Sequence, residues 1–575
     1  MIRILRFLEP YRGFVAIVLV LAAVQSLANL YLPTLNADII DNGVVKNDTG
    51  YILRVGGVML LVTLGGAICA VGTAFFASRT AVGFGRIIRA QLFTHVEQFS
   101  LHEFDTVGTA SLITRTTNDT NQVQQVLVIM LTLLITAPMT LIGGIILAAR
   151  EDVALSLVLI AAVPVLVISI LVIMTKAIPL FRAMQMKLDK LNLVLDEGLT
   201  GVRVIRAFDR TSHEQHRFDV ANLDVTDTAI TVNRIVAALW PMMMLVLNVS
   251  TVAIVWFGSI RINNGDLQVG ALSAFMIYAL LILFSLLMLS FLFVMLPRAT
   301  ASAARINAVL DMRTEITDPA QPQRPGDLRG HVEFEDVTFS YPGAEEPAIS
   351  HVSFSARPGQ VTAIIGGTGA GKSTLVNLIP RFYDIDSGRV LVDGMDVREM
   401  TQQDLRAKIG LVPQTAVIFS GTVAENIRFG NEGASDKEVR HAADVAQATE
   451  FISEMGDGFN STISQGGTNI SGGQKQRLSI ARALVRKPEV FIFDDSFSAL
   501  DYATDARLRA ALRGETTNAT VLIVAQRVST IIGADQILVL DEGRVVGSGT
   551  HQELMQSNDV YREIVLSQVT AEEIA

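Results

Sequence analysis

The fold is decided by the stretch Gly366-Gly367-Thr368-Gly369-Ala370-Gly371-Lys372-Ser373-Thr374 of this 575-residue chain. A β-branched apolar run over residues 361–365 precedes it and predicts a buried strand, and residues 375–379 predict the first turns of a helix. A strand, a glycine-rich loop and a helix in this order are typical of a phosphate-binding loop. The sequence therefore predicts a nucleotide site here rather than a glycine-rich turn that binds nothing.

Each residue type in this loop has a physical role. Glycines let successive backbone N–H groups point inward, where a side chain would block a phosphate. The helix N-terminus adds its partial positive charge. We expect Lys372 to reach the β- and γ-phosphates and the Ser373 hydroxyl to ligate Mg²⁺.

The composition excludes an ordinary soluble enzyme. Hydrophobic residues are 50% of the chain, charged residues are 18%, and the mean hydropathy is +0.43, which together indicate membrane spans. The net charge of −10 argues against nucleic acid as a partner. The single cysteine, Cys69, excludes a disulfide framework, and the eight histidines lack the spacing of a zinc or iron site.

Six apolar stretches of about 20 residues or more are long enough to cross a bilayer. They cover residues 14–35, 52–77, 126–149, 155–174, 237–257 and 269–296. The connections 78–125 and 175–236 are rich in helix formers with apolar residues at helical spacing. We therefore expect the span helices to continue well past the membrane surface.

The arginines and lysines predict the orientation. They gather before the first span, between the second and third, and between the fourth and fifth, so both termini are expected to be cytoplasmic. The span interiors carry amides such as Gln25, Asn29 and Asn248 but almost no ionisable side chain. Buried charges would mark an ion pathway, so their scarcity favours an apolar or amphipathic cargo.

A proline-rich and acidic stretch, residues 314–330, predicts a linker. It divides the chain into a transmembrane domain (1–313), the linker (314–330) and a soluble domain (331–575). The expected fold is therefore multi-domain: an all-α membrane domain of six long transmembrane helices, followed by an α/β P-loop ATPase domain.

Further motifs in the soluble half point to a nucleotide held between two subunits. The buried strand at 490–494 ends in Asp494, a carboxylate suited to hold Mg²⁺ opposite Ser373. Ser471-Gly472-Gly473-Gln474 begins a helix and forms a second anion-binding backbone. One nucleotide does not need two cradles in one domain. We therefore expect the second cradle to serve a nucleotide held by another copy or by a partner.

These motifs, with Gln414 and the loop Ser498-Ala499-Leu500-Asp501, resemble those of an ATP-binding-cassette (ABC) domain. With six preceding spans, the chain looks like a half-transporter of the exporter class in the cytoplasmic membrane. The resemblance implies a dimer of twelve spans that opens alternately inward and outward as two cassettes close on ATP and Mg²⁺.

The resemblance also implies roles for single residues. Tyr341 would stack on the adenine, Gln414 would sense Mg²⁺ and couple to the spans, and Asp501 would lie in a loop between the subunits. Short cytoplasmic turns near residues 111–120 and 201–208 would be the coupling helices that touch the cassettes.

Two positions nearest the chemistry depart from the family pattern. Asp495 stands where the family usually has a glutamate that orients the attacking water, and Gln526 stands where it has the switch histidine. Aspartate draws its carboxylate back by roughly 1 Å, and such a misplacement can cost about 100-fold in rate. Glutamine donates a hydrogen bond but carries no imidazolium charge. Gln465 also stands where such exporters often have a glutamate.

The two changes admit two interpretations. One is the degenerate half of a heterodimeric, multidrug-type exporter: its own site binds ATP but turns it over slowly, while its intact signature completes the partner's site. The other is sequence drift in a functional homodimer. Beyond these, a soluble cassette ATPase of the DNA-repair type does not explain six spans. An importer on the exporter scaffold, for example of siderophores, is hardly distinguished from an exporter by the motifs.

Overall fold

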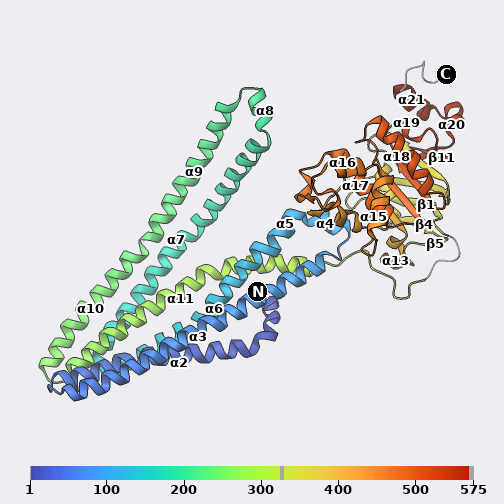
Figure 1. Ribbon diagram of the computed structural model, residues 1–575. Helices are drawn as coiled ribbons and strands as arrows, with labels where there is room; N and C mark the ends of the chain where they lie inside the picture. The colour runs from blue at the N-terminus through green and yellow to red at the C-terminus, as the bar shows by residue number, and fades with distance from the viewer. Residues whose placement is uncertain (1, 324–328, 569–575) are drawn as a thin grey trace. The chain divides into compact units, whose positions relative to one another are not determined.

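Long apolar helices form the first part of this computed structural model, which describes residues 2–323 and 329–568. In these ranges, six helical segments are long and apolar enough to cross a membrane, which confirms the predicted number of spans. They consist of α2 (Arg12–Asp38), α3 (Thr49–Val96), α6 (Thr120–Glu151), α7 (Val153–Thr200), α9 (Thr211–Ala237) with α10 (Leu239–Asn263), and α11 (Val269–Leu310) (Figure 1). Several continue well beyond their apolar stretches, as expected.

The chain separates into two units. The first comprises Met1–Glu97 and Thr109–Met312, and the second comprises Gln98–Gly108 and Arg313–Ala575. The expected linker at 314–330 begins the second unit, and its residues 324–328 lie outside the described residues.

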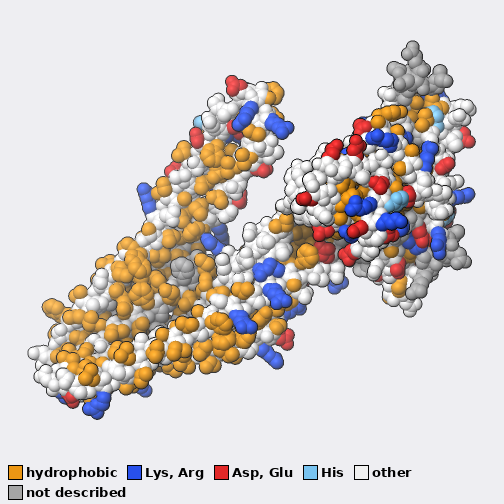
Figure 2. Space-filling view, in the orientation of Figure 1, with side chains coloured by type: hydrophobic (Ala, Val, Ile, Leu, Met, Phe, Trp, Pro, Cys, Tyr) orange, Lys and Arg blue, Asp and Glu red, His pale blue; other side chains and the backbone are white. Residues whose placement is uncertain are grey.

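Within the first unit, α2 packs on α3, α11 on α6, and α7 on both α9 and α10. Small residues permit close approach: a Cβ added to Gly72 would lie 2.9 Å from Leu21 Cδ1, and one added to Gly144 would lie 2.8 Å from Ile282 Cγ1. Hydrophobic side chains cover much of the visible surface of these helices (Figure 2). Leu53, for example, is 78% exposed, as suits contact with lipid.

Two buried carboxylates link these helices at their ends. Asp119, in the π-helical turn η3 (Arg115–Asp119), accepts hydrogen bonds from Arg305 Nε (2.7 Å) and Ser302 Oγ (2.8 Å) of α11. Asp152, before α7, pairs with Arg261 of α10 at 2.6 Å. Each carboxylate joins residues more than 100 positions apart in the chain.

The short helices differ in part from the predicted coupling turns. Helix α8 (Val202–Ala207) occupies the second turn, at the tip of the α7–α9 pair (Figure 1). Residues 111–120 form no separate turn, because they lie in α5 (Thr109–Thr114) and η3 and lead directly into α6. The separate helix is α4 (Leu101–Val107), which belongs to the second unit. There the Glu103 carboxylate accepts from the backbone N–H of Glu315 at 3.2 Å.

The second unit contains a six-stranded sheet in the order β12-β11-β3-β10-β9-β6. Its strands from β11 to β6 are parallel, and β12 is antiparallel at the edge. The bounds are β3 (Val361–Gly366), β6 (Ile409–Val412), β9 (Val490–Asp494), β10 (Thr520–Val524), β11 (Gln536–Asp541) and β12 (Arg544–Gly549). Because parallel strands end at one edge, the sheet brings the loops after β3, β6, β9 and β10 together.

A second, antiparallel sheet has the order β2-β1-β4-β5, and a two-stranded sheet joins β7 to β8. These strands are β1 (Val332–Phe339), β2 (Ile349–Ala356), β4 (Ser387–Val392), β5 (Met395–Asp396), β7 (Gly421–Thr422) and β8 (Thr462–Ile463). The helices include α12 (Lys372–Leu378), α13 (Gln402–Ala407), α14 (Val423–Arg428), α15 (Asp436–Val445), α16 (Thr449–Glu454), α17 (Gly472–Val485), α18 (Tyr502–Glu515), α19 (Val528–Ile531), α20 (His551–Ser557) and α21 (Asp559–Gln568).

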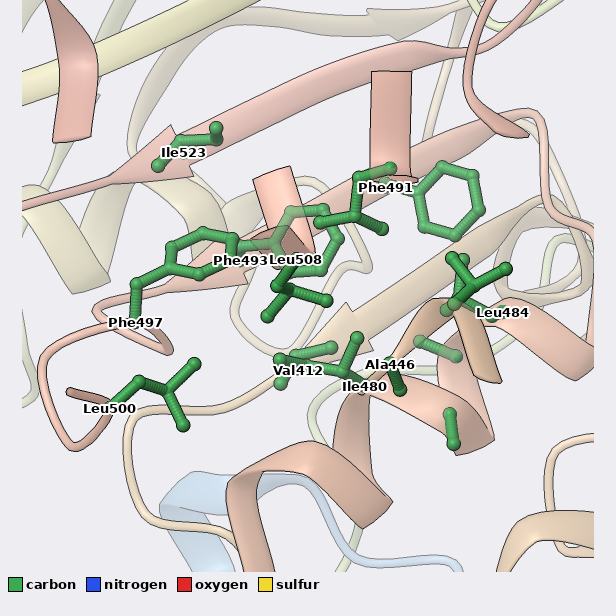
Figure 3. Packing of buried hydrophobic residues seen from close by; sticks show 14 of the residues in the cluster. Val412, Ala446, Ile480, Leu484, Phe491, Phe493, Phe497, Leu500, Leu508 and Ile523 are labelled. Atoms are coloured by element: carbon green, nitrogen blue, oxygen red, sulfur yellow. The ribbon is translucent and has the colours of Figure 1, made fainter. Parts of the chain in front are cut away.

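A hydrophobic core holds β9 against α17 and α18 (Figure 3). Phe491 and Phe493 of β9 pack with Ile480 of α17 and Leu508 of α18, and all four are nearly or fully buried. Burying such side chains stabilises the fold by about 1.5–3 kcal/mol each. This packing determines where Asp494, at the end of β9, and Ser471, at the start of α17, are presented.

Candidate nucleotide site

The P-loop connects β3 to α12 in the predicted order of strand, loop and helix. Gly371 adopts a φ of +93°, a left-handed conformation that glycine tolerates best. A Cβ added to Gly366 would overlap the carbonyl oxygen of Leu540 on β11. At Gly367 and Gly369, in contrast, no described atom lies within 4 Å of an added Cβ. The loop is therefore packed at its base and open at its mouth.

Lys372 lies over this loop. Its Nζ donates hydrogen bonds to the carbonyl oxygens of Gly366 (2.9 Å) and Gly367 (2.6 Å). Burial lowers the pKa of the Lys372 ammonium from its ordinary value, while Asp495 and Asp494 act in the opposite direction. The positive charge is thus held next to the open face of the glycines, where a phosphate group fits.

Ser373 and Asp494 meet across the loop. The Ser373 hydroxyl donates to Asp494 Oδ1 at 3.0 Å, although the two residues are 121 positions apart. Asp494 is buried, and burial raises the pKa of its carboxyl, while the Ser373 hydrogen bond opposes the rise. A hydroxyl and a carboxylate placed together are the oxygen ligands that Mg²⁺ takes in proteins, so the residues present fit the ion.

Asp495 is the centre of a second polar cluster. Its Oδ2 accepts a hydrogen bond from Gln526 Nε2 at 2.8 Å and lies 3.5 Å from Gln414 Nε2. Its backbone has a φ of +47°, which is uncommon for aspartate, and its N–H donates to Val524 O. Burial raises the pKa of the Asp495 carboxyl. Three residues that the sequence analysis named separately are therefore brought together.

Tyr341 contacts α12 through Thr374. Its hydroxyl is 3.0 Å from Thr374 Oγ1, and its ring is 37% exposed. The ring meets Tyr383 edge to face, with centroids 5.4 Å apart, and burial raises the pKa of Tyr383 to about 12. The sequence analysis missed Tyr383, since no local motif marks it.

The signature residues form the start of α17. Ser471 caps this helix by accepting from Gln474 N (3.3 Å), and the Gln474 side chain accepts in return from Ser471 N (2.8 Å). Among the described residues, no hydrogen bond joins residues 471–474 to the P-loop. Asp501 caps α18 by accepting from Thr504 N at 2.9 Å.

One more residue of α17 escaped the sequence analysis. Gln476 donates through Nε2 to the carbonyl oxygens of Pro413 (3.3 Å) and Gln414 (3.2 Å). It therefore connects the signature helix to the backbone that carries Gln414. Gln476 lies one helical turn past Gly472 and Gly473, and its burial is a property of the tertiary structure that no local pattern marks.

Comparison with known proteins agrees with this geometry. The family model of the ABC transporter transmembrane region matches residues 15–287, and a second model, described as ABC transporter, matches residues 349–498. An uncharacterized ABC transporter ATP-binding protein of Mycobacterium tuberculosis is 44% identical over 565 residues, which are 98% of this chain and 97% of the relative.

Two further similarities extend over nearly the whole chain. The ATP-dependent lipid A-core flippase of Vibrio vulnificus is 30% identical over 568 residues, 98% of this chain and 96% of the relative. The solved structure of a bacterial Atm1-family ABC exporter with ATP bound superposes with a TM-score of 0.80 at 26% identity, covering 98% of this chain and 99% of the other. The chain therefore belongs to the ABC transporter family, as a multi-pass half-transporter of the cytoplasmic membrane that joins the membrane region and the ATPase domain of an ATP-driven exporter.

Proposed function

We propose that this chain is one half of a heterodimeric exporter and that its own P-loop forms a slow, degenerate ATP site. The observation that carries the proposal is the Asp495–Gln526 pair, formed by the two residues that stand where the family usually has a glutamate and a histidine. The shorter carboxylate stands back from the water position, and the neutral amide cannot offset charge that develops on the phosphate. The residues proposed to bind ATP thus match the family pattern, whereas the two residues proposed to act in hydrolysis depart from it.

The binding residues support ATP retention at this site. The glycines and Lys372 of residues 366–374 would hold the phosphates, and Tyr341 would stack on the adenine. Mg²⁺ would be held by Ser373 and Asp494, with Gln414 nearby. The ion would supply positive charge that neutralises the phosphates.

The signature residues 471–474 support the proposal that this chain completes the ATP site of its partner. Ser471 and Gln474 keep a complete capping box, and no described atom lies within 4 Å of a Cβ added to Gly472. An N-terminal helix turn with open backbone N–H groups suits a phosphate from a second subunit. In this proposal the signature of this chain, with the Asp501 loop beside it, completes the partner's hydrolytic site.

The proposed cargo is apolar or amphipathic. The spans carry almost no ionisable side chains, and a relative that matches nearly the whole chain is named a lipid A-core flippase. The distribution of arginine and lysine supports cytoplasmic termini, with both P-loop and signature on the ATP-containing side. A homodimer with a weakened site and an importer are the alternatives that the experiments must separate.

The test compares ATP turnover by the full chain alone with turnover by the chain and its candidate partner half-transporter, both in lipid nanodiscs. Slow turnover alone and fast turnover together are expected, and Lys372→Ala provides the binding-deficient control. Comparable turnover in the two preparations would instead identify a homodimer. In inside-out vesicles, ATP-driven accumulation of a fluorescent lipid is expected for an exporter, and ATP-driven loss would identify an importer.

A further inference from the structure

The C-terminal helix α21 (Asp559–Gln568) ends against the loop that carries Gln526. Gln568 Nε2 donates to the carbonyl oxygen of Gln526 at 2.8 Å, and Gln568 Oε1 accepts from the backbone N–H of Val528 at 2.9 Å. The nitrogen and the oxygen of the Gln568 side-chain amide therefore both bind the backbone of the loop at residues 526–528. The two elements are about 40 residues apart in the chain, so tertiary packing alone brings them together.

The bond to Val528 has a structural reason. Val528 begins the short helix α19 (Val528–Ile531), whose first N–H groups have no partner within the helix. Within the described residues, Arg527, at the N-cap position, makes no side-chain capping hydrogen bond. Gln568 supplies the missing acceptor from a different helix. The side chains of Val528 and Ile531 are buried, so the rest of α19 is held by packing.

Helix α21 is itself firmly anchored. Tyr561 is fully buried, and its hydroxyl lies 2.8 Å from His551 Nδ1 of α20. Val565 is buried in the same core, and Tyr561 N donates to Asn558 Oδ1 at 2.7 Å. The anchored helix presents Gln568 in a defined position relative to the loop.

The same loop reaches the nucleotide site through its side chain. Gln526 donates through Nε2 to Asp495 Oδ2, so its backbone is held by Gln568 while its side chain holds the carboxylate. We propose that Gln568 is a positioning residue for this chain's own ATP site: it sets the Gln526 loop, and thereby Asp495, for trapping and turnover of the bound nucleotide. This inference rests on the proposed function in one respect, that the P-loop of this chain binds ATP.

The first experiment measures whether the two hydrogen bonds of Gln568 stabilise the Gln526 loop. Hydrogen exchange of residues 526–531 is followed in the full-length chain with its partner in nanodiscs. Gln568→Met keeps the length of the side chain and removes both hydrogen bonds, so exchange at Val528 is expected to rise about tenfold. Gln568→Glu keeps an acceptor for Val528 and is expected to preserve its protection. Ser567→Ala is the matched control, because the Ser567 hydroxyl bonds to Ile564 O of its own helix.

The second experiment measures the consequence at the site. Vanadate trapping of 8-azido-ATP on this chain is compared between the wild type and the variants. Gln568→Met is expected to lower trapping about tenfold, with the ATP concentration for half-maximal labelling unchanged, because the phosphate and adenine contacts remain. Gln568→Glu should fall between the two, and Ser567→Ala should match the wild type.

Two results would overturn the inference: exchange at residues 526–531 that is unchanged by Gln568→Met, or faster exchange that leaves trapping intact. Failure of the proposed function is read separately, from wild-type turnover with and without the partner. The inference is tested by the ratio of vanadate trapping in the Gln568 variants to trapping in the wild type, measured at this chain's own site. This trapping ratio reports the effect of Gln568 whether the wild-type site hydrolyses ATP slowly or quickly.

Discussion

The side-chain amide of Gln526 donates to the carboxylate of Asp495 at 2.8 Å, and the two residues lie 31 positions apart, after neighbouring strands β10 and β9. The family resemblance implies that they occupy the positions of the usual switch histidine and glutamate. In this pair, one amide N–H of Gln526 is bonded to one carboxylate oxygen of Asp495. In the degenerate site that we propose, this bond would hold the carboxylate in place without the longer reach or the positive charge that fast hydrolysis uses.

Restoring the family residues should raise turnover at this site. The double variant Asp495→Glu, Gln526→His is expected to hydrolyse ATP about 10–100-fold faster, because the carboxylate reaches the water and the imidazole can carry charge. Each single variant should gain less, since the two side chains contact each other and their effects are coupled. The measurement is ATPase activity with the partner's P-loop lysine replaced, and unchanged turnover of the double variant would contradict a degenerate site.

Two glycines of the P-loop should respond differently to alanine. Gly371→Ala places a Cβ 2.7 Å from Ala348 O in a left-handed conformation, so a loss of about 1–3 kcal/mol of stability is expected. Gly367→Ala meets no described atom within 4 Å and should leave stability nearly unchanged while weakening ATP binding. Thermal unfolding and nucleotide titration separate the two effects, and equal unfolding midpoints would contradict this account.

Ser471→Ala should lower the ATPase activity of the heterodimer by more than the loss of stability from removing a helix cap can explain. Removing an N-cap costs about 1 kcal/mol, and the same cost applies to Thr550→Ala, which removes the capping box at the start of α20. Thr550→Ala is therefore the matched control. If ATPase of the heterodimer falls equally in the two variants, Ser471 acts only as a cap.

As the pH is lowered, Mg²⁺-dependent nucleotide binding should weaken at a higher pH than it would if Asp494 and Asp495 had ordinary carboxyl pKa values. Burial raises the pKa of Asp494 and of Asp495. The stability contributed by a group with a raised pKa is fully present below its unfolded pKa and lost as pH rises through the folded pKa. As the pH falls toward the ordinary carboxyl pKa of 3.8, the nucleotide-free chain should thus gain stability, while protonation of the same carboxylates weakens Mg²⁺ binding. Thermal unfolding of the nucleotide-free Asp494→Asn variant, measured as a function of pH, should show a smaller gain in stability on acidification than the wild type.

The buried carboxylate of Asp119 should matter more than an exposed pair in the same unit. Asp119→Asn weakens the contacts with Arg305 and Ser302 and is expected to cost about 1–3 kcal/mol. Arg3→Ala breaks the Arg3–Asp311 pair, whose side chains are 64% and 47% exposed, and should cost under about 1 kcal/mol. Thermal unfolding in detergent should show a clearly larger shift for Asp119→Asn, and equal shifts would argue against the buried link.

Local patterns predicted the parts of the protein whose cause is local. The length of each apolar run determines whether a helix spans a bilayer, so six spans could be read without coordinates. The P-loop likewise depends on glycines and flanks that adjoin one another in the chain. Residues 111–120, the expected first coupling turn, continue directly into α6, whereas the capping box of Ser100 and Glu103 marks the start of the separate helix α4.

The sequence by itself determined the two domains, the phosphate loop and the two altered positions, because each depends on residue types within a short segment. Only the tertiary structure decided which distant groups meet: Ser373 with Asp494, Gln476 with the Gln414 backbone, and Gln568 with the loop of Gln526. The order of the parallel strands, the packing of α17 on β6 and the packing of α21 on α19 and α20 bring these groups together. Hydrogen bonds between such groups depend on distances of a few tenths of an ångström, which no spacing along the chain encodes.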